Sequence, residues 1–181
     1  HVSGCLAMLP ELPDDIKAVQ EMGVSLFAGE AEGRLDEVLR DGWRGALKPL
    51  YDHMSDLPAL QGQPTPILPR SVIDRYTSVM GCFDCGRGCP FQCSFCTIIN
   101  VQGRKSRWRD ADDIERLVRA NLAQGVSRFF ISDDNFARNQ NWEAIFDRLI
   151  ELNENDGIGV TFLIQVDTLC HQIPNFIEKA A

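Results

Sequence analysis

The chain has 181 residues, of which 44% are hydrophobic and 24% charged, and its formal net charge is −8. This composition predicts a globular protein with core enough for one or two domains. No apolar run is long enough to cross a bilayer, so no membrane-spanning helix is expected. The negative charge argues against a general nucleic-acid binder, because such a protein neutralises phosphates with Lys and Arg.

The first part of the chain alternates helical and strand-like patterns. We expect, in order, a helix at 13–22, a short apolar strand at 24–28 and a helix at 32–40. Gly23 and Gly42 are expected to end the two helices. Four prolines between residues 58 and 69 then break regular structure, so residues 49–74 are predicted to be a linker or a crossover along the surface. This segment divides the chain into residues 1–48 and 75–181.

The second part of the chain continues the alternation. Strands are expected at 75–81, 127–132 and 159–166, with helices at 110–124 and around 142–150 between them. This order predicts an α/β fold with parallel strands, here the opening half of a β/α barrel or of a doubly wound sheet. The chain begins without Met and stops inside a helix expected to begin near Pro174. We therefore interpret the chain as a fragment of a longer protein.

Three cysteines lie close together in the run from Gly88 to Cys96, at positions 89, 93 and 96. An iron–sulfur cluster is only a few ångströms across, so this stretch is expected to curl into a loop rather than run as a strand. Full ligation of a four-iron cluster takes four cysteines. Three thiolates from Cys89, Cys93 and Cys96 would therefore leave one iron open to a substrate or cofactor.

Two other uses of the cysteines are open. A structural zinc site could take Cys82, Cys85, Cys93 and Cys96 as two Cys-x2-Cys pairs. That arrangement leaves Cys89 without a role, and the pairs are closer than the usual separation of ~15–20 residues. Disulfides are disfavoured because the seven cysteines are an odd number and no signal peptide precedes them, so a reducing cytoplasm fits best. Cys82 and Cys85 could equally pack or serve an auxiliary role.

The run Gly-Cys-Pro-Phe-Gln-Cys-Ser-Phe-Cys at 88–96 resembles the signature loop of radical SAM enzymes, with Phe95 as the aromatic residue before the last cysteine. The resemblance implies a four-iron four-sulfur cluster on Cys89, Cys93 and Cys96, with S-adenosylmethionine bound to the open iron. It also implies reductive cleavage of that cofactor to a 5′-deoxyadenosyl radical, with electrons from a reductant such as flavodoxin or ferredoxin. The alternative class is an electron-transfer or structural zinc module without this chemistry.

Polar residues follow the predicted strands, where α/β folds place their chemistry. Ser132, Asp133 and Asp134 could accept hydrogen bonds from the methionyl amine of S-adenosylmethionine. The family often has Gly-Gly-Glu at this point, so the acceptor among the three stays open, and an aspartate here could instead cap a helix. By resemblance, Gln165 lies near the ribose and methionyl parts of the cofactor.

A basic run follows the cysteine loop and consists of Arg104, Lys105, Arg107 and Arg109. The run could form a nucleic-acid patch, but we favour a basic loop directly after an anionic cluster, and four charges are too few to decide between the two.

Residues 1–48 are similar to the last third of the cobalamin-binding, Rossmann-like domain that precedes many radical SAM barrels. The similarity rests on Gly29-Glu30-Ala31-Glu32 after the strand at 24–28, where that family often has Gly-Glu-Gly-Glu. It implies a cobalamin-dependent enzyme, whose relatives often transfer a methyl group. The sequence does not identify the substrate.

Overall fold

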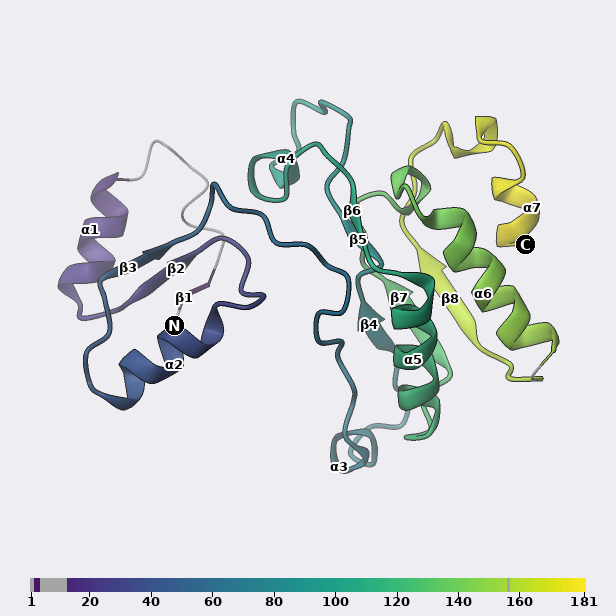
Figure 1. The fold of residues 1–181 in the computed structure, drawn as a ribbon, viewed down its shortest axis with the longest axis horizontal. Coiled ribbons are helices and arrows are strands. Elements are labelled where there is room, and N and C mark those ends of the chain that lie inside the picture. The colour runs from purple at the N-terminus through teal and green to yellow at the C-terminus, as the bar shows by residue number, and fades with distance from the viewer. Residues whose placement is uncertain (1, 4–12, 156) are drawn as a thin grey trace.

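We describe residues 2–3, 13–155 and 157–181 of a computed structural model of the chain. They contain two three-stranded parallel sheets, which confirms the predicted α/β class with parallel strands (Figure 1). The N-terminal sheet has the order β1-β2-β3 and consists of Val2–Ser3, Leu26–Ala28 and Leu50–Asp52. The C-terminal sheet has the order β4-β7-β8 and consists of Gly81–Phe83, Arg128–Ile131 and Thr161–Ile164.

The N-terminal sheet is accompanied by α1 (Pro13–Glu21) and α2 (Leu35–Trp43). The predicted first helix and the strand at 24–28 are confirmed, but the second helix begins later than expected and continues through Gly42. An interior glycine costs a helix only about 1 kcal/mol relative to alanine, and the chain leaves α2 at Gly45, whose φ of 66° is left-handed.

The strand β3 corrects the prediction that the segment 49–74 lacks regular structure. Leu50–Asp52 pairs with β2 and is the third strand of the N-terminal sheet. The Tyr51 side chain is buried, and its hydroxyl donates to Asp41 over 2.8 Å. Burial of the Tyr51 side chain thus stabilises a short strand here, although the adjacent Pro49 disfavours regular structure.

The chain then crosses to the C-terminal sheet as a packed strap rather than a free linker. Leu60 is completely buried. The Gly62 N–H donates to Asp113 over 2.8 Å, and the Leu68 N–H donates to the Asn121 side-chain oxygen over 3.0 Å. A short helix, α3 (Arg70–Ile73), ends the crossing. Residues 53–74 thus cross between the two sheets along the surface of the C-terminal part, which is one of the two forms predicted from the prolines.

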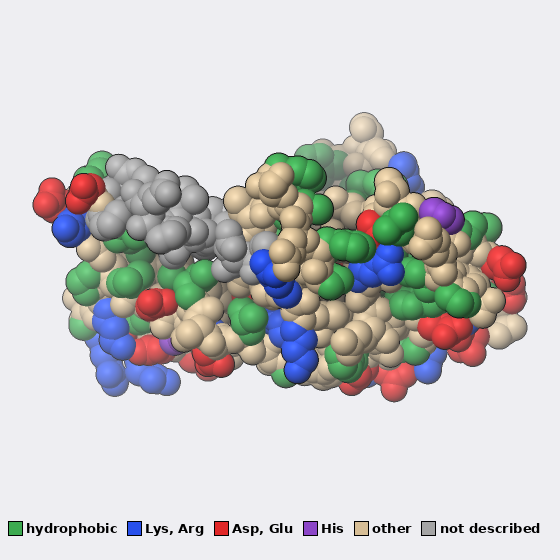
Figure 2. Space-filling model, turned by 90° about the horizontal axis from the view of Figure 1, so that it is seen from above, with side chains coloured by type: hydrophobic (Ala, Val, Ile, Leu, Met, Phe, Trp, Pro, Cys, Tyr) green, Lys and Arg blue, Asp and Glu red, His purple; other side chains and the backbone are tan. Residues whose placement is uncertain are grey.

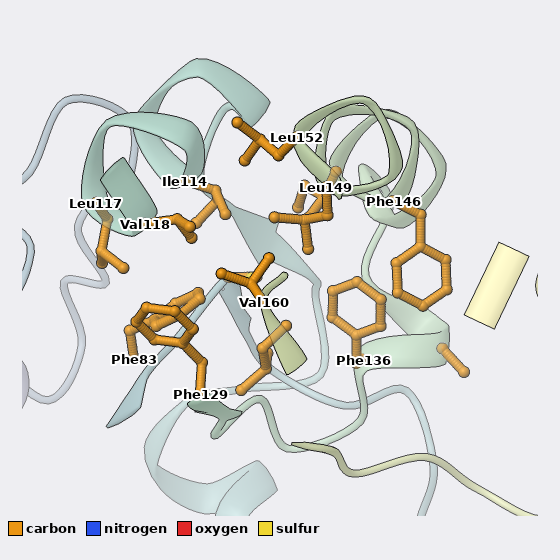
Figure 3. Close-up of a cluster of buried hydrophobic side chains, with 14 of the residues drawn as sticks. Phe83, Ile114, Leu117, Val118, Phe129, Phe136, Phe146, Leu149, Leu152 and Val160 are labelled. Atoms are coloured by element: carbon orange, nitrogen blue, oxygen red, sulfur yellow. The ribbon is translucent and has the colours of Figure 1, made fainter. Parts of the chain in front are cut away.

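The C-terminal sheet carries the main hydrophobic core on the face covered by α5 (Ala111–Leu122) and α6 (Trp142–Glu154) (Figures 1 and 3). Phe83 and Phe129 extend from the strands into this core, where they meet Ile114, Leu149 and other apolar side chains of the two helices (Figure 3). The core thereby fixes the strands whose carboxyl ends carry the polar residues described below.

The strand expected at 75–81 is wrong in position, because β4 begins only at Gly81. A Cβ atom at Gly81 would lie 2.7 Å from the Phe129 ring, so the absence of a side chain lets β4 lie close to β7. The helices at 110–124 and 142–150 and the other two strands are confirmed within a few residues at their ends.

Smaller elements complete the C-terminal part. They are the hairpin strands β5 (Gly86–Arg87) and β6 (Arg107–Trp108), α4 (Ile98–Val101), the 3-10 turns η2 (Phe136–Arg138) and η3 (Cys170–Gln172), and α7 (Phe176–Ala180). The sequence did not predict the hairpin, whose strands are only two residues long.

None of the helices in the described part of the chain is long and apolar enough to span a membrane. Figure 2 views the molecule from the end at which α4 lies. On this face, Lys and Arg side chains stand in separate groups among acidic and apolar ones, without a continuous basic surface.

Candidate functional site

The cysteine loop lies between β5 and β6, beyond the carboxyl end of β4, and is curled as expected (Figure 1). Cys89 and Cys96 are half-buried, whereas Cys93 is exposed. The Cys89 N–H donates to the Gly103 carbonyl over 3.2 Å, and the Cys96 N–H donates to the Cys93 carbonyl over 3.0 Å. The loop thus doubles back on itself beyond the carboxyl end of β4.

Gly88 lets the chain enter this loop. Its φ of 93° is left-handed, and a Cβ atom there would lie 2.5 Å from the Lys105 carbonyl oxygen. Because that contact is with backbone, any side chain at this position would push the two arms of the loop apart. Glycine is therefore required directly before the first cysteine.

Two consecutive acidic residues after β7 hold the entrance of the loop by its backbone. The buried Asp133 carboxylate accepts from the Cys85 N–H over 2.6 Å and from the Gly86 N–H over 3.0 Å, and its other oxygen accepts from the Asn139 amide over 3.0 Å. Asp134 accepts from the Gly88 N–H over 2.9 Å. We call these contacts the loop clamp.

Burial dominates the electrostatics of the loop clamp. It raises the pKa of Asp133 to about 7, although the three hydrogen bonds that this carboxylate accepts act in the opposite direction. Burial also raises the pKa of Asp134, against the Gly88 hydrogen bond. Asp133 is only 2% exposed, and its carboxylate is engaged on both oxygens. The structure thus places Asp133 and Asp134 against the loop backbone, and their contact with a cofactor amine stays a prediction.

The next residue, Asn135, connects the loop to the end of β8. Its side-chain nitrogen donates to Asp167 over 3.0 Å and lies 3.9 Å from the Cys89 sulfur. Arg138 binds the same Asp167 carboxylate through two nitrogens, over 2.8 and 2.9 Å, and its guanidinium lies over the Phe91 ring. The Arg138 contact is the main reason that the pKa of Asp167 falls to about 2.

The other predicted cofactor-binding residues lie at the open side of this end of the sheet. Within the described part of the chain, the side chains of the half-buried Ser132 and the exposed Gln165 have no hydrogen-bond partner. The Phe95 side chain is 88% exposed. Ser132 also lines a cavity of about 330 Å³ together with Cys82 and Arg87. The structure therefore leaves these three predicted side chains accessible.

Cys82 and Cys85 differ sharply in their surroundings. Cys82 is exposed, whereas Cys85 is completely buried in the hydrophobic core. Burial raises the pKa of the Cys85 thiol, with further contributions from Asp133 and Asp84. A zinc ligand must be a thiolate, so these surroundings disfavour Cys85 as a ligand and favour packing as its role.

Arg104 and Lys105 of the basic run are exposed, whereas Arg107 and Arg109 are turned to acidic partners. Arg107 binds the buried Glu30 carboxylate with both terminal nitrogens, and Arg109 is 2% exposed and paired with Asp84. Arg87 in β5 joins the same network, donating to Glu30 over 2.7 Å and to Glu32 over 2.6 Å. Arg107 and Arg109 therefore fasten the hairpin to the rest of the protein.

This network also gives the segment Gly29-Glu30-Ala31-Glu32 a structural role. Gly29 has a φ of 106°, and a Cβ atom there would lie 2.8 Å from the backbone of His53. The tight turn directs Glu30 and Glu32 away from β2 and toward the hairpin arginines. The N-terminal sheet is thus connected by ion pairs to the two strands that hold the cysteine loop.

The donor set fits an iron–sulfur cluster by its chemistry. Cys89, Cys93 and Cys96 are free thiols of one loop, and one of them faces an amide donor. Among the described residues, no three His, Cys, Asp or Glu side chains gather closely enough to hold a single metal ion. A cubane spreads its ligands more widely than a single ion does, and a loop with three free thiols has the residue types that such a cluster needs.

A family model for the radical SAM superfamily matches residues 84–175, which is about half of the chain and includes the cysteine loop, the loop clamp and β8. The chain belongs to the radical SAM superfamily of enzymes. Among curated proteins it is similar to three from microorganisms.

An uncharacterized methyltransferase of Synechocystis is 37% identical over 84 residues, which are 46% of this chain and 15% of that protein. A Methanocaldococcus jannaschii protein named as a methylthiotransferase is 25% identical over 168 residues, 85% of this chain and 36% of that protein. The bacteriochlorophyllide d C-12(1)-methyltransferase of Chlorobaculum tepidum is 29% identical over 119 residues, 62% of this chain and 26% of that protein. The chain thus spans between about one seventh and about one third of these relatives.

Proposed function

We propose that this chain binds a four-iron four-sulfur cluster through Cys89, Cys93 and Cys96, with S-adenosylmethionine on the open iron. The observation that carries the proposal is the loop clamp, because it fixes the entrance of a three-cysteine loop at the carboxyl ends of the parallel strands, where α/β folds bind ligands. Membership of the radical SAM superfamily supports the same cofactors.

When bound, such a cluster supplies one electron that splits the sulfonium of S-adenosylmethionine into methionine and a 5′-deoxyadenosyl radical. Within the protein, Asp133 and Asp134 hold the loop, and the accessible Ser132 and Gln165 would orient the methionyl and ribose parts. Phe95 is exposed and free to cover the cofactor. A reduced flavodoxin or ferredoxin would supply the electron.

The test uses the full-length protein, reconstituted with iron and sulfide under anaerobic conditions. S-adenosylmethionine should perturb the electron paramagnetic resonance spectrum of the reduced cluster. Ser132→Ala should weaken this response by about tenfold in cofactor concentration, the loss expected for one hydrogen bond to a charged group. Ser127→Ala, at the other end of β7, is the matched control and should respond like the wild type. If S-adenosylmethionine leaves the spectrum of a fully loaded wild-type cluster unchanged, the chain is better explained as part of an electron-transfer protein.

We further propose that the whole protein binds cobalamin through an N-terminal Rossmann-like domain and transfers a methyl group. The names of two relatives as methyltransferases support the reaction class. The parallel sheet β1-β2-β3 and the turn at Gly29 support the domain type. We propose that this domain includes residues up to 52, that the strap follows, and that the barrel begins near residue 75.

Equilibrium dialysis against hydroxocobalamin tests this second proposal. The full-length protein should bind the ligand, whereas the 181-residue chain should bind it poorly, because its N-terminal sheet has three short strands and a dinucleotide-type fold builds its pocket from several strand ends. Lack of binding by the full-length protein would leave a radical SAM enzyme whose N-terminal domain serves another purpose. Equally tight binding by both proteins would show that the pocket is complete within this chain.

A further inference from the structure

The Asn135 amide is held in one orientation beside the first cysteine of the loop. Its side-chain oxygen accepts from the Asp167 N–H over 3.2 Å, and its side-chain nitrogen donates to the Asp167 carboxylate over 3.0 Å. A flipped amide would oppose donor to donor and acceptor to acceptor at both contacts. The nitrogen must therefore face the Cys89 sulfur, 3.9 Å away.

The partner that holds Asn135 is itself fixed. Arg138 binds both oxygens of Asp167, and the Leu169 N–H donates to the same carboxylate over 2.8 Å. Asn135 is 6% exposed, so water does not compete freely for its amide. The arrangement of Asn135, Asp167 and Arg138 is thus a rigid support that directs one N–H donor at a sulfur atom.

An N–H donor beside a cluster thiolate changes the electronic properties of the cluster. The reduced state carries one more negative charge than the oxidised state, so a donor stabilises the reduced state more and raises the reduction potential. In the neighbouring loop clamp, Asp133 and Asp134 accept from backbone N–H groups and from the Asn139 amide. Asn135 differs from Asp133 and Asp134 in donating to a sulfur.

We propose that Asn135 is a positioning residue that donates a hydrogen bond to the Cys89 thiolate and raises the reduction potential of the bound cluster. The inference rests on the proposed function, because it requires a cluster on Cys89. It concerns how readily the cluster takes up an electron, which precedes any encounter with substrate.

The experiment is a redox titration of the reconstituted full-length protein, followed by electron paramagnetic resonance. Asn135→Ala should lower the potential by about 59 mV, which is a tenfold shift of a one-electron equilibrium. Asn135→Asp, which keeps the shape but removes the donor, should lower it as well.

Asn153→Ala is the matched control. Asn153 bridges the Val160 backbone with both ends of its amide, over 2.9 and 3.2 Å, as Asn135 bridges Asp167, but it lies at the opposite end of β8 and away from the cysteines. The reduction potential of the cluster in Asn153→Ala should equal that in the wild type.

The outcomes separate the two proposals. A wild-type protein that assembles no cluster would overturn the proposed function, and this inference with it. Loaded Asn135 variants with the wild-type potential would overturn the inference alone. So would loss of the cluster from both Asn135 variants while Asn153→Ala retains it, because Asn135 would then be needed for assembly rather than for the potential.

Discussion

Replacing any one of Cys89, Cys93 and Cys96 with alanine should abolish the iron–sulfur cluster, whereas Cys82→Ala and Cys85→Ala should leave it in place. Each of the first three thiols belongs to the loop between β5 and β6, and a three-cysteine site has no spare protein ligand. Iron and sulfide content after anaerobic reconstitution of the full-length variants, together with the visible absorption of the cluster, measures the effect.

The two control variants probe different surroundings. Cys82→Ala removes an exposed thiol, and Cys85→Ala removes one sulfur from the hydrophobic core, at a modest cost in stability. Iron retained by Cys89→Ala, together with tightly bound zinc that is lost from Cys85→Ala, would reject the cluster and establish two zinc-binding Cys-x2-Cys pairs.

Asp133→Ala should destabilise the protein by about 3 kcal/mol, because it leaves buried donors without an acceptor. The affected groups are the Cys85 and Gly86 N–H groups and the Asn139 amide. Denaturant unfolding of the cluster-free full-length protein gives the free energy, and the variant should also reconstitute poorly because the loop entrance is no longer held. Asp134→Ala, which removes one hydrogen bond to Gly88, should cost less. Equal stability of Asp133→Ala and the wild type would show that the loop clamp does not hold the loop.

The pH dependence of stability offers a separate test of Asp133. Burial raises the pKa of this carboxyl from 3.8 to about 7, so the folded state retains a proton that the unfolded chain releases. This contribution to stability is present below about pH 4 and is lost as the pH rises through about 7. Asp133→Asn cannot titrate, so its stability should vary less with pH across this window. An unchanged pH profile in Asp133→Asn would mean that Asp133 is ionised throughout.

The cysteine loop could be predicted from the sequence because its chemistry is local. Three thiols within eight residues, preceded by a glycine, already require a curled segment, and no distant residue is needed to infer it. The helices could also be predicted, since apolar residues such as Ile114 and Leu117 recur at helical spacing and are buried in the core. Strand positions were less accurate, because residues 75–81 contain no signal that distinguishes strand from exposed coil.

The partners of the polar residues could not be predicted in the same way. Ser132, Asp133 and Asp134 were candidates for a contact with a cofactor amine, since a carboxylate at a strand end suits a cation. The pattern did not show that Asp133 and Asp134 also accept from backbone N–H groups 46 to 48 positions away. Every residue except proline has a backbone N–H group, so the sequence does not indicate which of these groups a carboxylate will bind. The one available signal was that Asp133, Asp134 and Asn135 are consecutive, which fits three contacts to consecutive parts of one loop.

The sequence by itself determined the class of this protein: an α/β fold of parallel strands with a radical SAM cysteine loop, since local periodicity and residue type carry that information. Only the tertiary structure decided which charges meet. It paired Glu30 with Arg87 and Arg107, 57 and 77 positions away, and so connected the N-terminal sheet to the strands that flank the cysteine loop. Such pairs depend on how whole elements pack, and packing is a property of the folded chain that no short stretch of sequence contains.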